Sequence, residues 1–151
     1  MIKSMYPFWS ALISAVIAQI LKPFIRAAMH HDWKPHMAVE SGGMPSSHSA
    51  MVTALALSVG IQENFRSTLF AVSSILAIIV IYDAANVRYY SGQNAQVTQQ
   101  LVKDVQDLFH VDFLDPVYDI KLKEVLGHKW SEVLGGIILG AATALIINFW
   151  F

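Results

Sequence analysis

The sequence contains no cysteine, which excludes structural disulfides and thiol chemistry. Charged residues make up only 14% of the 151 residues and apolar residues 55%, an unusual balance for a soluble globular domain. The formal net charge is −1, so the chain has no overall basic footprint of the kind that binds nucleic acid. It also lacks internal repeats and low-complexity tracts, and its length predicts one domain over residues 1–151.

Four stretches contain no Asp, Glu, Lys or Arg, and they cover residues 4–21, 41–62, 67–82 and 133–151. Their lengths lie on either side of the roughly 20 residues that cross a bilayer. We therefore predict an all-α integral membrane bundle of about four transmembrane helices. A soluble bundle of buried helices is the alternative. Trp9 and Trp150, near the two ends of the chain, are typical of interfacial anchors and favour the membrane.

Four crossings place most of the polar residues at one membrane surface. Eight of the ten Lys and Arg residues fall on this face. Because basic loops are biased toward the cytoplasm, we expect a multi-pass cell-membrane protein whose reactive face is cytoplasmic. The candidate site residues on this face are Lys22, Arg26, Ser46, Ser47, His48, Asp83, Arg88, His128 and Glu132.

A polar insert separates the third and fourth stretches. Its apolar residues recur at helical spacing, at Val97, Leu101, Val105, Leu108 and Phe109. This spacing predicts an amphipathic helix that lies in the membrane interface or covers the site. Residues 112–116 should break that helix, and a second short helix is expected over residues 117–126, ending at Gly127.

Residues 42–50 read GGMPSSHSA and form the most informative run of the chain. Pro45 suits the first turn of a helix, so Ser46 and Ser47 should lie near a helix N-terminus. Unpaired N–H groups at such an end attract phosphate, and His48 beside them can donate a proton near neutral pH. An ordinary helix start with a polar histidine is the alternative interpretation.

His128 and Glu132 are four residues apart, which places them on one face of the last helix if that helix includes both. A carboxylate that accepts one imidazole N–H makes the other ring nitrogen a better base or nucleophile. For Glu132 alone, a first-turn acid that complements the helix dipole is the alternative. Further along, Gly136 and Gly140, with Ala144 beyond them, predict close helix packing.

Asp83 and Arg88 end the third apolar stretch. An ionisable residue at membrane depth is a functional candidate, and the planar guanidinium of Arg88 suits phosphate oxygens. Asp83 is expected either to orient Arg88 or Lys22 or to form a structural ion pair.

Together these segments resemble the phosphatidic acid phosphatase type 2 and vanadium haloperoxidase superfamily, and most closely its short divergent branch. The resemblance rests on residues 19–22, 42–50, 82–93 and 126–136. It implies that Lys22 binds phosphate, with Ser46 and Ser47 contributing to the cradle. It also implies that His48 is the general acid and His128 the nucleophile, oriented by Glu132.

The sequence departs from the pattern of that superfamily at several positions. Ser47 stands where a glycine is usual, and Glu132 where an aspartate is usual. Arg26 is the nearest arginine after Lys22, and no Arg lies six residues before His128. Lys123 and Arg88 are the candidate substitutes for that missing arginine.

The expected activity is hydrolysis of a lipid phosphate or diphosphate, glycerolipid or isoprenoid, through a phosphohistidine. Protein cations would neutralise the phosphoryl charge, so no metal or other cofactor is expected. The clustered His30, His31 and His36 are then solvated loop residues rather than metal ligands. A catalytically silent lipid-phosphate binder or assembly subunit is the alternative, and a transporter is a weaker one. The thin scaffold predicts a homodimer, or a site covered by residues 93–109.

Overall fold

The computed structural model describes residues 5–30, 42–110 and 129–150, and this part of the chain is helical with connecting turns. The elements are α1 (Tyr6–His30), α2 (Ser47–Glu63), α3 (Thr68–Tyr82), a π-helical turn η3 (Asp83–Val87), α4 (Arg88–Phe109) and α5 (Trp130–Asn148). The expected break at residues 112–116 and the short helix over 117–126 lie outside the described residues. So do His31 and His36.

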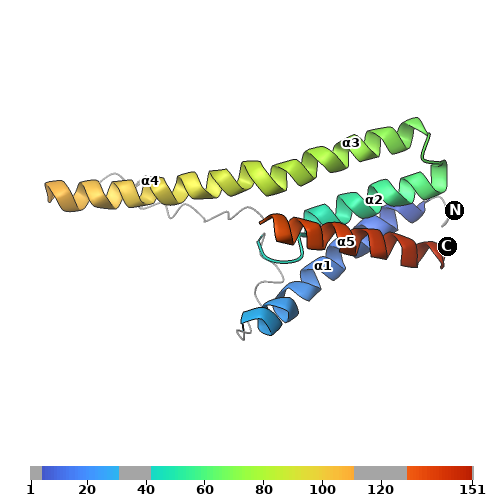
Figure 1. The fold of residues 1–151 in the computed structure, drawn as a ribbon, viewed down its shortest axis with the longest axis horizontal. Coiled ribbons are helices and arrows are strands. Elements are labelled where there is room, and N and C mark those ends of the chain that lie inside the picture. Colours follow the sequence, from blue (N-terminus) through green and yellow to red (C-terminus); the bar gives the residue numbers. More distant parts are fainter. Residues whose placement is uncertain (1–4, 31–41, 111–128, 151) are drawn as a thin grey trace.

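Helix α2 occupies the centre of the bundle and packs against α1, α3 and α5 (Figure 1). Successive helices of the bundle run in opposite directions, so the N- and C-termini lie at the same end. The hydroxyl of Tyr6 donates to the carbonyl of Ala144 at 2.7 Å and ties the start of α1 to the end of α5. The C-terminal half of α1 and the starts of α2 and α5 lie at the other end of the bundle, away from the chain termini.

Small residues form the core, and large apolar residues face outward. Ala18, Ala50 and Ala54 are fully buried, whereas Phe8 and Ile138 are at least half exposed. A soluble bundle has the reverse arrangement, because water drives large apolar side chains inward. Small residues at helix contacts and large ones outside are typical of helices surrounded by lipid.

Three helical segments are long and apolar enough to cross a membrane: Tyr6–Met29, Thr68–Phe109 and Trp130–Asn148. Helix α2 has 17 residues and is shorter than the apolar stretch from which it was predicted. The difference arises at its start, where residues 42–46 form a loop rather than a helical turn.

Helix α1 does not end near Lys22, as the charge-free stretch predicted, but continues for two more turns to His30. Pro23 removes one backbone donor, and the helix nevertheless continues through Ala27 and Ala28, which are strong helix formers. The extension carries Arg26 along the same helix as Lys22.

The predicted packing stripe on α5 is confirmed. A Cβ atom added at Gly136 would collide with the carbonyl oxygen of Ser46, and one at Gly140 with that of Ala50. Ala144 continues the stripe and is fully buried. The backbones of α2 and α5 therefore approach as closely as the absence of side chains permits.

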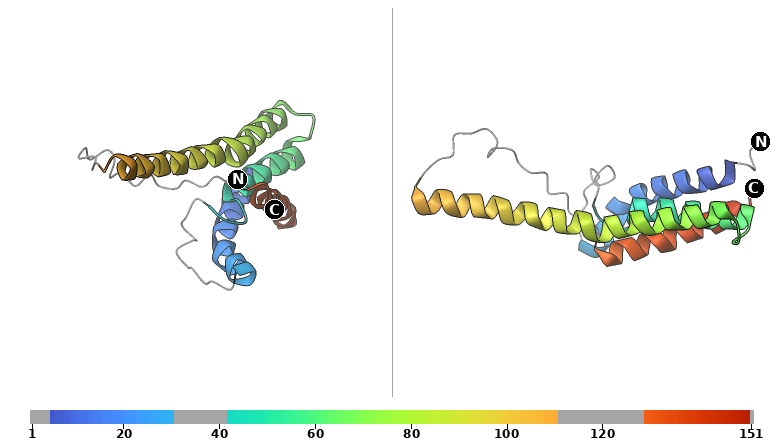
Figure 2. Two further views of the ribbon diagram at one scale, coloured as in Figure 1. Left: turned by 60° about the vertical axis from the view of Figure 1, so that its left-hand side comes forward. Right: turned by 90° about the horizontal axis from the view of Figure 1, so that it is seen from above.

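Helix α4 is the amphipathic helix expected in the insert, but it does not cover the site. It continues α3 through η3 as one rod that extends beyond the bundle (Figure 2). The chain stays helical across the junction, because Asp83 and Val87 both keep right-handed helical dihedrals. Residues 93–109 are thereby held away from the bundle, and the predicted cover is wrong for the described chain.

Candidate functional site

The loop of residues 42–46 is fixed to the start of α5. Ser46 is the N-cap of α2, and its hydroxyl accepts hydrogen bonds from the N–H of Ser49 at 3.3 Å and the hydroxyl of Ser49 at 3.0 Å. Its backbone N–H donates to the carbonyl of Glu132 at 2.9 Å. Pro45 therefore precedes the cap rather than sitting in the first turn. The Ser46 hydroxyl serves as the helix cap in this arrangement.

Replacing Ser46 by alanine should lower the free energy of unfolding by about 0.5–2 kcal/mol, because the N-cap bond of α2 is lost. Ser47→Ala is the matched control, since the Ser47 side chain does not cap the helix. Thermal unfolding of the two variants in detergent, followed by circular dichroism, measures the difference. Equal melting temperatures would show that the Ser46 cap contributes nothing.

A pocket of about 250 Å³ opens where α1, the loop and α5 meet, and we call it the basic pocket. Its lining residues are Lys22, Ile25, Arg26, Met29, Gly43, Met44, Lys129, Ser131 and Glu132. Three lining side chains are cationic and one is a carboxylate, which leaves an excess of two positive charges. A phosphate monoester carries about −1.5 to −2 at neutral pH, so its charge matches this excess.

Lys22 is the most unusual member of the basic pocket. Its side chain is only 1% exposed, although lysine is almost never fully buried without a partner. It follows Tyr6, Ser10, Ser14 and Ala18 at four-residue spacing along the buried face of α1. The same helical repeat that forms the core thus places an ammonium group at the end of the bundle.

The start of α5 adds a second source of positive potential. Its N-cap residue, Lys129, makes no side-chain capping bond, and the following N–H groups point toward this end of the bundle. The helix dipole favours an anion here. Glu132 lies in the first turn of α5, where an acid complements the helix dipole, which was the alternative role expected for it. Glu132 also lines the basic pocket.

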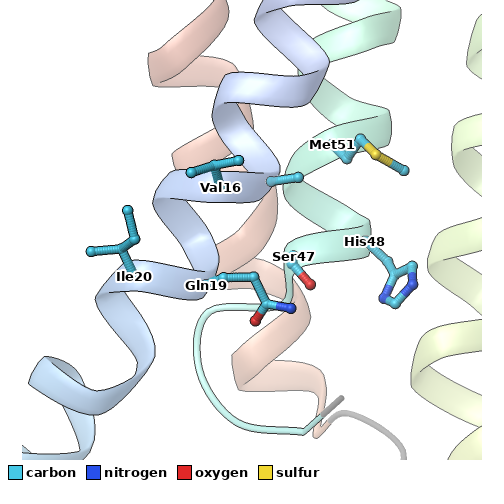
Figure 3. Close-up of a pocket in the computed structure, with 7 residues that line it drawn as sticks. Val16, Gln19, Ile20, Ser47, His48 and Met51 are labelled. Carbon is cyan, nitrogen blue, oxygen red and sulfur yellow. The ribbon is translucent and has the colours of Figure 1, made fainter. Parts of the chain in front are cut away.

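His48 lies in a different cavity from Lys22. A groove of about 330 Å³ between α1 and α2 is lined by Ala15, Val16, Gln19, Ile20, Ser47, His48 and Met51 (Figure 3). Ser47 lies between Gln19 and His48, and the His48 imidazole points away from α1. The groove is apolar along Val16 and Ile20 and polar at its other end. Residues 42–48 connect the groove to the basic pocket.

Other predicted site residues are placed only in part. His128 and Lys123 lie outside the described residues, as does the side chain of Arg88, whose backbone begins α4. Asp83 is half-buried at the start of η3. The helical relation predicted between His128 and Glu132 lies outside the described residues, of which α5 begins at Trp130.

Two lining residues were missed as site residues from the sequence. Lys129 was assigned to the correct face but not to the site, although it is three residues from Glu132. Gln19 is a polar amide in a charge-free stretch, three residues before Lys22 and thus on a neighbouring part of the same face. Its side-chain oxygen is buried with no hydrogen-bond partner among the described residues.

An α-helical bundle with a small-residue core, outward-facing large apolar side chains and a basic pocket at one end defines a helical membrane protein. The chain belongs to the divergent PAP2 family, whose model matches residues 4–143. It is 37% identical over 153 residues to the uncharacterized membrane protein YuiD of Bacillus subtilis (strain 168), covering 97% of this chain and 96% of that protein. No solved structure matches the chain.

Proposed function

We propose that the protein is a membrane phosphatase that hydrolyses a lipid phosphate or diphosphate, with the phosphoryl group held in the basic pocket. The observation that carries this proposal is the buried ammonium group of Lys22 beside Arg26 and Lys129. The three cations of the pocket outnumber its one carboxylate, so the pocket favours a bound anion. Family membership favours phosphate as the anion.

A lipid is the proposed substrate because the pocket opens beside a groove with apolar walls. Val16 and Ile20 line that groove and are about half exposed at the outer surface of α1. An apolar tail in the groove would leave its phosphorylated end near Ser47 and the loop. Both glycerolipid and isoprenoid phosphates have this shape.

In the proposed reaction the imidazole of His128 attacks phosphorus and forms a P–N bond. The P–O bond to the lipid alkoxide breaks, and His48 gives its proton to the departing oxygen. Lys22, Arg26 and Lys129 stabilise charge on the non-bridging oxygens. Water then gives a proton to His48 and attacks the phosphohistidine; the P–N bond breaks, which releases phosphate and restores both imidazoles.

The decisive experiment compares phosphate release from a panel of lipid phosphates by the purified wild-type protein with that of His48→Asn and His128→Asn. Both variants should lose at least about 100-fold in rate, since each loses a proton donor or the nucleophile. His110→Asn is the matched control, because His110 ends α4 with a left-handed backbone that asparagine tolerates. Full activity in either site variant would contradict the proposed roles.

A second candidate is a lipid-phosphate binder or assembly subunit that does not hydrolyse its ligand. The separation of His48 from the basic pocket favours it, as does the lack of an arginine six residues before His128. Lipid phosphate bound by the wild-type protein without any phosphate release would establish this candidate and exclude the phosphatase.

We further propose that α2 is a fourth crossing and that the basic pocket faces the cytoplasm. Alternating helix directions and the central place of α2 support the fourth crossing. Eight of the ten Lys and Arg residues fall on the pocket side of such a topology, which supports the orientation.

A further inference from the structure

Helix α4 carries an apolar face that is not covered by any part of the described chain. Val97, Leu101 and Leu108 are 67%, 60% and 74% exposed. The helix has 22 residues, about 33 Å at 1.5 Å per residue, and its packing is with η3 at its own base. Within the segment Thr68–Phe109 the charge-free stretch ends at Tyr82, and α4 carries Lys103, Asp104 and Asp107, so a membrane crossing does not account for its exposed apolar side chains.

The exposed face is a narrow seam, and we call it the α4 seam. Its members are Tyr90, Asn94, Val97, Leu101, Val105 and Leu108. At 100° per residue these positions fall within about 80° of the helix circumference. Val102 and Phe109 extend the apolar surface on one side only. A seam of this width is typical of two helices in a coiled coil rather than of a helix lying on a broad core.

We propose that the α4 seam pairs with the α4 seam of a second copy of this chain, in a parallel two-stranded arrangement. Two copies inserted in one membrane with the same orientation are related by a twofold axis along the membrane normal. Since α4 continues the direction of α3 (Figure 1), two copies related by such an axis have parallel α4 helices at the same height, and seams that face the axis are in register. Each seam residue then meets its own counterpart.

Asn94 is the observation that selects this pairing among coiled-coil arrangements. It is an exposed polar residue within an otherwise apolar or aromatic seam. In an in-register parallel pair the two Asn94 amides meet and can hydrogen-bond to each other. A single asparagine at such a position specifies register and the two-stranded state, at some cost in stability.

The charges of α4 argue against the membrane surface as the occupant of this face. After Arg88 its charged residues are Lys103, Asp104 and Asp107, and most other polar residues are glutamine. Helices that lie on membranes are typically rich in Lys and Arg on the polar face. The rod also keeps the direction of α3 instead of turning across the end of the bundle (Figure 2).

The same rod offers further contact surface nearer the bundle. Helix α3 packs mainly against α2, and its Ile75, Ile78 and Tyr82 are 57%, 62% and 60% exposed. The continuous helical rod from Thr68 to Phe109 is 42 residues long. Two rods in parallel could thus contact each other beyond α4, which strengthens a pairing that a single short coiled coil would support only weakly.

Cysteine cross-linking tests the proposal directly, because the natural chain has no cysteine. Leu101→Cys and Leu108→Cys, each in the full chain in native membranes, should form disulfide-linked dimers on mild oxidation. Gln99→Cys and Gln106→Cys are the controls, since both lie on the opposite side of α4. We expect at least about fivefold more dimer on a non-reducing gel for the seam positions.

Two outcomes would overturn the proposal. One is equal cross-linking at seam and control positions, which indicates random collision. The other is no cross-linking at any of the four, as for a monomer or for an α4 that lies on the membrane. Neither outcome bears on phosphate release, so the test is independent of the proposed activity.

Discussion

Alanine at position 140 is expected to destabilise the fold more than any other single-methyl addition on α5. The added Cβ would collide with the carbonyl oxygen of Ala50 and lie 3.0 Å from its Cα atom, and both belong to the backbone of α2. A backbone cannot rotate away as a side chain does, so α2 and α5 must separate along the contact that holds the bundle. We expect a loss of about 3 kcal/mol in the free energy of unfolding, the upper end of typical overpacking costs.

Gly135→Ala is the matched control on the same helix. A Cβ atom there meets the terminal methyl of Met44 at 3.0 Å, which is the flexible end of a side chain, and otherwise only atoms at ordinary distances. Both substitutions gain up to about 1 kcal/mol of helix propensity, so the difference isolates the packing. Thermal unfolding in detergent micelles and size-exclusion chromatography measure it. If the melting temperature of Gly140→Ala equals or exceeds that of Gly135→Ala, the close α2–α5 contact is wrong.

Sequence patterns predicted those parts of the fold that depend on local composition. The charge-free stretches located α1, α3 and α5, because a lipid-facing helix must be apolar over most of its length. The small-residue stripe at Gly136 and Gly140 located a helix contact without naming its partner. That partner is the backbone around Ser46 and Ala50, a contact between segments 90 residues apart along the chain, which no local pattern encodes.

The errors occurred at helix ends. Charge was taken to end α1 at Lys22, but a buried lysine can stay within a helix when the bundle surrounds it. Pro45 was placed in the first turn of α2, but the side-chain bonds of Ser46 determine where that helix begins. Such ends are decided by individual hydrogen bonds and by tertiary contacts, which periodicity does not report.

The candidate site was predicted more fully in its charges than in its geometry. Lys22, Arg26 and Glu132 were named from the sequence, and the structure brings them into one pocket with Lys129. His48 was expected beside the same phosphate, yet it lines the neighbouring groove. Motif order along a chain does not specify which side of a loop each side chain occupies.

Lys22→Met removes the positive charge of the Lys22 side chain but keeps its packing, so it tests the role of that charge in the basic pocket. Methionine fills nearly the same volume and is readily buried, so the protein should still fold and elute as the wild type. Binding of a lipid phosphate should weaken at least about tenfold, and phosphate release should fall about 100- to 1,000-fold, the usual cost of removing one group that stabilises transition-state charge. Equilibrium binding and a phosphate-release assay on the purified protein measure the two effects.

Lys103→Met is the control for this change, because it removes the same charge from an exposed residue of α4 that does not line the basic pocket. It should leave binding and release unchanged. If Lys22→Met binds lipid phosphate more weakly but hydrolyses it at the wild-type rate, Lys22 stabilises the bound substrate and not the transition state. Unchanged binding in Lys22→Met would mean that the buried ammonium group does not contact the anion, and the basic pocket would lose its assignment as the phosphate site.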